Sequence, residues 1–140
     1  MIRRKNQHTL IADPGDVVDI CGQCAGASIV VGAEVANVRA ITIQLKDAQG
    51  NDLAHRATVQ IAVLADANGD AFVAVGGTTG IAIGADGALL PIVAKKLFLA
   101  ISEADGDIDL TWTDTGTDVA YLAVILPNGR MIISAALTNT

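Results

Sequence analysis

The sequence predicts an all-β protein: an antiparallel β-sandwich of immunoglobulin-like or jelly-roll-like type, with minor helix and an extended N-terminal arm. Hydrophobic residues make up 51% of the chain and aromatic residues only 3%. Aliphatic side chains must therefore fill the core, and the β-branched ones favour strands. From Asn37 onward, apolar and polar residues alternate with a period of two, which is typical of strands. Turns rich in Gly, Asp and Asn separate about eight such segments, as in a sandwich or jelly roll.

The length of 140 residues fits one domain. We expect residues 1–12 to form a basic arm and residues 13–140 to form a single β-sandwich domain, in which residues 13–36 are a glycine-rich lead-in. A short helix is expected only at residues 32–36, because no longer window carries apolar residues at helical spacing.

The first two predicted strands are Arg39–Leu45 and Ala57–Ala65. In the first, Ile41 and Ile43 share an apolar face, and the second alternates in the same way. Residues 46–52 between them are turn-forming. We therefore expect these two strands to pair as a hairpin.

The middle of the chain predicts three short strands. They are Phe72–Val75, Ile81–Ile83 and Leu89–Val93, and the glycine run at residues 76–80 predicts a loop. Pro91 lacks a backbone N–H, so the third of these strands should lie at a sheet edge or contain a bulge.

The last third alternates most clearly. Its predicted strands are Leu97–Ser102, Asp107–Thr113, Val119–Leu126 and Arg130–Leu137. Asn128-Gly129 predicts a type I′ turn, because both central residues of that turn need positive φ. This turn should pair Leu126 with Met131.

Two sets of alternating apolar residues are predicted to form the dry core. They are Ile41, Ile43 and Leu45 in one strand, and Ile108, Leu110 and Trp112 in another. The segment from residue 119 to residue 137 is apolar on both faces, so it should be sandwiched or buried in an oligomer. The predicted oligomer interface consists of Leu122, Val124, Ile132 and Ala136, which fall opposite Tyr121, Ile125, Met131 and Ile133.

Charge is unevenly distributed. Arg3, Arg4 and Lys5 stand together in the arm, whereas all 15 acidic residues follow from Asp13 onward, and the formal net charge is -6. An acidic body repels phosphate backbones, so nucleic acid is not expected as a partner. The three basic residues are the predicted partner-binding residues of the arm.

The chain also argues against secretion and membrane insertion. The N-terminal segment lacks the apolar stretch of a signal peptide. The longest apolar run, Val119–Leu126, is far shorter than the roughly 20 residues of a membrane helix. We expect synthesis in a cytoplasm and no membrane partner.

Two patterns resemble metal sites and are interpreted as structural. Cys21 and Cys24 form a single C-x-x-C, which supplies only two ligands, although His8 and His55 could complete a zinc site. Residues 66–70 start like a calcium loop but lack its later Gly and Glu. We expect reduced cysteines, a surface turn, and neither metal nor cofactor.

Four carboxylates, Glu103, Asp105, Asp107 and Asp109, lie within seven positions. They could form a glycosidase pair or a metal site, but acid-base pairs need a cleft that separates their pKa values. We interpret them as a solvated face that resists aggregation. No nucleophile motif accompanies either histidine, so an enzyme, for instance a small hydrolase, is not expected.

Residues 41–54, with an alternating strand ending in Lys-Asp-x-x-Gly-x, resemble the opening hairpin of bacterial and phage immunoglobulin-like modules. Residues 80–87, 102–111 and 123–129 resemble small proteins of tailed phages and prophages. The resemblance implies a virion structural protein, such as one decorating the capsid surface.

A decoration or cement protein would bind the outside of the shell, stabilise it by bridging subunits, and have the major capsid protein of the same virion as its partner. Its location would be the virion surface, and a homotrimer is favoured because shells offer quasi-threefold sites. The alternative is an immunoglobulin-like tail-fibre or adhesion module that binds a host cell-surface glycan. Such a module should expose aromatic residues, and the chain has only one Trp and one Tyr.

Overall fold

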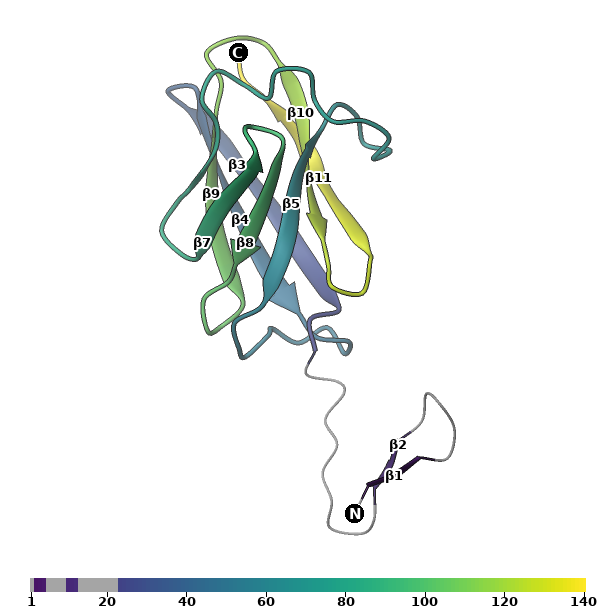
Figure 1. The fold of residues 1–140 in the computed structure, drawn as a ribbon. Helices are drawn as coiled ribbons and strands as arrows, with labels where there is room; N and C mark the ends of the chain where they lie inside the picture. Colours follow the sequence, from purple (N-terminus) through teal and green to yellow (C-terminus); the bar gives the residue numbers. More distant parts are fainter. Residues whose placement is uncertain (1, 5–9, 13–22) are drawn as a thin grey trace.

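The computed structural model describes residues 2–4, 10–12 and 23–140, and its strands from Gly26 onward form two antiparallel sheets packed face to face (Figure 1). In order across the five-stranded sheet lie β11 (Met131–Thr138), β10 (Val119–Ile125), β5 (Thr58–Leu64), β8 (Leu97–Ile101) and β7 (Ala88–Val93). In order across the four-stranded sheet lie β3 (Gly26–Val35), β4 (Val38–Lys46), β9 (Asp107–Thr113) and β6 (Gly80–Ile83). The predicted all-β antiparallel architecture is confirmed.

The segment expected to be a lead-in contributes the ten-residue strand β3 instead, and no helix forms in the described residues. β3 pairs with β4, with Val35 opposite Val38. Ala36 and Asn37 form the two-residue connection with φ of 51° and 67°. Positive φ at both positions matches the twist of a hairpin. The prediction of a helix at residues 32–36 is therefore wrong.

β4 and β5 do not form the expected hairpin, because they belong to different sheets. β4 pairs with β3 and β9, and β5 pairs with β8 and β10. The turn that leaves β4 is built as its composition predicts: the Asp47 carboxylate accepts hydrogen bonds from the backbone N–H groups of Gln49 and Asn51. The chain then crosses from one sheet to the other.

The hairpin between β10 and β11 has a different register from the expected one. Ile125, not Leu126, lies opposite Met131. The Leu126 N–H donates to the Arg130 carbonyl, 2.9 Å away, so the loop has three residues. Only its third residue, Gly129, has positive φ, at 86°. One left-handed residue at the end is typical of a three-residue hairpin loop.

Two predictions for the middle of the chain, the strand at Phe72–Val75 and the effect of Pro91, have opposite outcomes. The strand expected at Phe72–Val75 is absent, and Phe72 makes only an isolated bridge with Leu64. The prediction from Pro91 is confirmed, because β7 is an edge strand and its register shifts between Pro91 and Val93.

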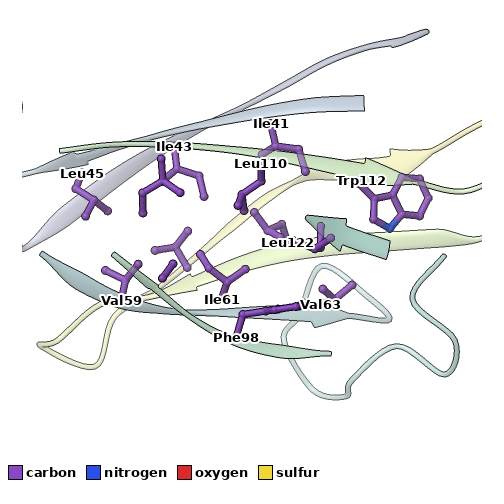
Figure 2. Close-up of a cluster of buried hydrophobic side chains, with 14 of the residues drawn as sticks. Ile41, Ile43, Leu45, Val59, Ile61, Val63, Phe98, Leu110, Trp112 and Leu122 are labelled. Carbon is purple, nitrogen blue, oxygen red and sulfur yellow. The ribbon is translucent and has the colours of Figure 1, made fainter. Parts of the chain in front are cut away.

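The predicted core is confirmed. All six predicted core side chains are at most 1% exposed. Figure 2 labels five of them, all but Ile108, and shows these five facing side chains of the other sheet, among them Ile61, Phe98 and Leu122. Gly77 has φ of +86° and lies against the Trp112 ring, where a Cβ would come within 3.0 Å of the indole nitrogen. Such a close approach requires glycine.

A network of hydrogen bonds around Asp114, after β9, fixes the crossover to β10. The Asp114 carboxylate is buried and accepts from the Thr78 N–H, the Thr78 hydroxyl and the Asp118 N–H. The Asn139 side chain donates to the carbonyls of Asn37 and Asp114. The end of β11 is thereby attached to the four-stranded sheet.

Candidate interaction surface

The strands of the five-stranded sheet carry no charged residue. Neither Asp, Glu, Lys, Arg nor His occurs in β5, β7, β8, β10 or β11. The inner side of this sheet is the core, so charge is not expected there. Its outer side faces away from the core and would ordinarily be polar, as in most antiparallel sheets with one solvated face.

Apolar side chains cover most of this outer surface, which we call the uncharged face. The ladder registers place alternate residues of each strand on it, so that Leu90 lies opposite Leu99. Its large exposed members, with their exposed fractions, are Leu90 (60%), Val93 (48%), Ile101 (38%), Val119 (47%) and Met131 (41%). The polar residues on it are uncharged, for example Gln60 and Tyr121. An uncharged face with several large exposed apolar side chains is typical of an interaction surface.

A second hydrophobic cluster supports this face from outside the main core. Ala62, Leu64 and Ala123 are at most 4% exposed, although they point away from the core. They are covered by the half-buried side chains of Leu97, Tyr121, Ile125 and Ile133. The face therefore consists of packed side chains and does not depend on isolated exposed residues.

The loop after β5 covers one corner of the uncharged face. The Ala65 N–H donates to the Ala71 carbonyl, and a Cβ on Gly69 would lie 3.0 Å from the Met131 sulfur. The Asp66 carboxylate accepts from the N–H groups of Asn68 and Gly69. The segment that begins like a calcium loop is thus a hydrogen-bonded turn.

The outer face of the four-stranded sheet carries acidic and polar side chains along β9, beside the exposed Val30 and Val35 of β3. Asp107 and Asp109 of β9 point outward beside Asp86, and one carboxylate oxygen of each lies within 4.8 Å of the others. Burial and the neighbouring charges of Asp109, Asp86 and Asp105 raise the pKa of Asp107. Its Oδ1 is buried and has no hydrogen-bond partner. These carboxylates repel each other, and like charges this close destabilise the fold.

Four acidic residues line a shallow groove at one end of the sandwich. Asp52, Asp86, Glu103 and Asp105 contribute to its walls. The Arg56 guanidinium lies 2.9 Å from the Glu103 carboxylate, and both side chains are largely solvated. An exposed pair of this kind contributes little to stability. The groove therefore carries four acidic side chains.

The predicted oligomer interface needs correction. Leu122 and Val124 are fully buried between the sheets, so they belong to the core and cannot form an interface in the folded domain. Ile132 is half-buried and packs against the core. Ala136 lies opposite Tyr121 at the outer side of the sheet. The inner and outer faces are thus exchanged for Leu122, Val124 and Ile132, whereas Ala136 is on the outer side because the register shifts between Tyr121 and Ala123.

The structure describes only some of the other candidate residues. Arg3 and Arg4 belong to β1 (Ile2–Arg4), which pairs with β2 (Leu10–Ala12). Lys5, Cys21 and His8 lie outside the described residues. Cys24 is a buried free thiol, and burial raises its pKa. Nδ1 of His55 lies 2.9 Å from the Arg56 carbonyl oxygen.

Sequence reasoning missed the residues of β7 and β8 that form one side of the uncharged face, namely Leu90, Leu99 and Ile101. The pattern that could have revealed them is the absence of charge from the whole segment of residues 88–94 and from residues 97–101. Alternation alone did not reveal them, because it does not say what the outward positions contact.

Comparisons with known proteins identify no relative. No family model, no curated protein and no solved structure matches the chain. Within the described residues, no helix is long and apolar enough to cross a membrane. The fold and its surfaces therefore define the class of this protein: a two-sheet antiparallel β-sandwich with one uncharged and one acidic outer face.

Proposed function

We propose that this chain is a non-enzymatic structural protein of a tailed-phage virion, a decoration or cement protein that binds the outside of the capsid and bridges its subunits. The observation that carries the proposal is the uncharged face of the five-stranded sheet. A protein that acts alone in solution rarely exposes such a surface, whereas a protein built into an assembly buries it.

The strand order supports an immunoglobulin-like sandwich rather than a jelly-roll-like one. In their order across the sheets, β3, β4, β9 and β6 correspond to strands A, B, E and D of a constant-type immunoglobulin domain, and β11, β10 and β5 to strands G, F and C. The hairpin of β7 and β8 extends the second sheet beyond β5. Immunoglobulin-like sandwiches often serve as display and adhesion modules, so this likeness is compatible with both candidate functions.

The proposed partner is the major capsid protein of the same virion, and the basic arm is the proposed attachment element. Arg3, Arg4 and Lys5 would contact an acidic shell surface, while the acidic body stays outside. The alternative function, glycan binding by a tail fibre or adhesin, has less support. Glycan-binding modules usually stack the sugar ring on a tryptophan side chain, and Trp112 of this chain is fully buried.

Particles produced from the genome that encodes this chain test the proposal. The chain should co-purify with the particles in many copies, and particles lacking it should lose surface density in negative stain. Its absence from purified particles, or its location only at the tail, would contradict a role in capsid decoration.

The attachment role of the arm has a separate test. Replacing Arg3, Arg4 and Lys5 by Ala in the full chain should abolish co-sedimentation with particles, and raising the salt concentration should weaken binding of the unchanged chain. Lys96→Ala in the turn after β7 is the control and should bind normally. Unchanged binding of the triple variant means that the body makes the contact.

A further inference from the structure

The charge of the chain restricts how two copies can meet. Each copy carries a formal net charge of -6, so two copies repel each other at long range. A close contact through the outer face of the four-stranded sheet would bring Asp107 and Asp109 toward the same residues of the second copy. The uncharged face brings no ionised strand residue into contact. It is the surface on which a second copy meets the least electrostatic opposition.

The size of this face suits a dimer of moderate affinity. Five strands spaced about 4.8 Å apart, with a rise of about 3.3 Å per residue, make a surface about 24 Å across and about 20 Å along. Two such surfaces in contact would bury close to 1,000 Å² in total, about the lower limit of a specific interface. The loop after β5 covers only the corner beside Leu64 and Met131.

The exposed edge of the sheet offers a different route to association, and the structure disfavours it. β7 is an edge strand whose free backbone groups could pair with another strand. Pro91 removes one donor from this strand, and its register shifts between Pro91 and Val93. Proline and bulges at an edge prevent strand addition. Backbone pairing through the β7 edge is therefore disfavoured, whereas the side chains of the uncharged face remain available for contact.

We infer that two copies of this chain associate through their uncharged faces, as a two-fold symmetric dimer with the acidic faces outward. One patch that contacts its own copy makes a two-fold interface, whereas a trimer would need two different complementary patches. The inference deepens the proposed function and rests on its premise that the uncharged face is buried in an assembly. It replaces the trimer predicted from shell symmetry by a dimer.

Sedimentation equilibrium of the full chain tests the inference, at about 1–100 µM, which brackets the micromolar affinity expected of so small an interface. The unchanged chain should be a dimer at the upper end of this range. Raising the salt concentration to about 1 M should preserve or strengthen the dimer, because apolar contacts are not screened and like charges are. A monomer throughout, or a trimer, would overturn the inference.

Matched variants locate the interface. Leu90→Lys places a charge on the uncharged face at a residue that is 60% exposed, and Val30→Lys makes the same kind of change at a 64% exposed residue on the other sheet. Val119→Lys makes the same kind of change on β10, on the same outer face but away from the β7 edge. Leu90→Lys and Val119→Lys should weaken dimerisation at least about tenfold, whereas Val30→Lys should leave it unchanged. Equal effects of all three variants would contradict face-to-face association.

The failure of this inference can be separated from the failure of the proposed function. Circular dichroism first establishes that each lysine variant is folded. A chain that binds particles but remains a monomer in solution refutes the dimer and leaves the decoration role intact. A chain that dimerises through the uncharged face but is absent from particles refutes the decoration role and leaves the dimer intact.

Discussion

The two sheets have the same inner pattern and opposite outer patterns. On β9, buried Ile108, Leu110 and Trp112 alternate with Asp107, Asp109 and threonines. On β8, buried Phe98 and Ala100 alternate with Leu97, Leu99 and Ile101. The inner residues are required for packing in both sheets, so they are alike. The outer residues report what each face meets: water on the four-stranded side, and apolar side chains of a second copy on the five-stranded side, as we propose.

This contrast also shows why the acidic side tolerates electrostatic strain. Asp86, Asp107 and Asp109 lie close together and repel each other. Charged side chains on exposed strands oppose unwanted association with other molecules, so these three carboxylates protect this face although they repel each other. The uncharged face has no such protection, so association of this protein should be directed to one side of the sandwich.

The largest effect on stability is expected for a substitution in the hydrophobic core between the two sheets. Leu110→Ala should reduce the free energy of unfolding by about 2–5 kcal/mol, because it leaves a cavity between the sheets. Leu110 is 1% exposed. Urea denaturation measures the loss, and Thr111→Ala on the outer side of the same strand is the control, with an expected change of about 0.5 kcal/mol or less. Equal losses would show that the inner and outer sides of β9 are not distinct.

The second prediction concerns the buried carboxylate at the crossover between the sheets. Burial acts to raise the pKa of Asp114, but hydrogen bonds from Thr78, Gly116 and Asp118 outweigh it and hold the pKa below its ordinary value of 3.8. Asp114→Ala should cost about 1–3 kcal/mol, because the donors lose a buried acceptor. Asp114→Asn, which keeps one acceptor oxygen, should cost less.

The pH dependence of unfolding separates this contribution from others. Because the pKa is lower in the folded state, the stabilisation by Asp114 is complete above 3.8 and is lost as the pH falls through the folded-state pKa. The difference in stability between the unchanged chain and Asp114→Ala should therefore shrink in acid. A difference that stays constant from neutral pH to below pH 3.8 would exclude this role of the charge.

The smallest effect is expected on the acidic face and has the opposite sign. Asp107→Asn should stabilise the domain by a few tenths of a kcal/mol to about 1 kcal/mol, because it removes one of three mutually repelling charges at a partly solvated site. The pKa of Asp107 is raised by burial and by its acidic neighbours. Asp70→Asn, in the turn after β5, is the control for loss of charge alone.

Acid should remove the advantage of Asp107→Asn. With a raised folded-state pKa, Asp107 becomes protonated as the pH falls through that value, and the repulsion disappears from the unchanged chain. The stabilisation by the variant should be full above the raised pKa and vanish below the ordinary value of 3.8. Thermal melts across this range measure it. A destabilised variant at neutral pH would mean that Asp107 makes a favourable interaction on this face.

The sequence by itself determined most strands after Asn37, most turns and the core. Alternation placed Ile41, Ile43, Leu110 and Trp112 inside, because a strand that buries one face must carry apolar residues at every second position. Asp47 and Gly129 marked turns because side-chain acceptors and positive φ are local requirements. Pro91 marked an edge or bulge because it lacks a donor. Each of these features depends on neighbouring residues alone.

Only the tertiary structure decided which strands pair and which face of a two-sided apolar strand points inward. β4 and β5 are adjacent in sequence yet lie in different sheets, and the pairing of β5 with β8 and β10 depends on residues far along the chain. Leu122 and Tyr121 both suit a core, so their composition could not show that Leu122 is buried and Tyr121 is on the outer side. A period of two fixes which residues share a face, but the inward face is chosen by packing between sheets, which no local pattern contains.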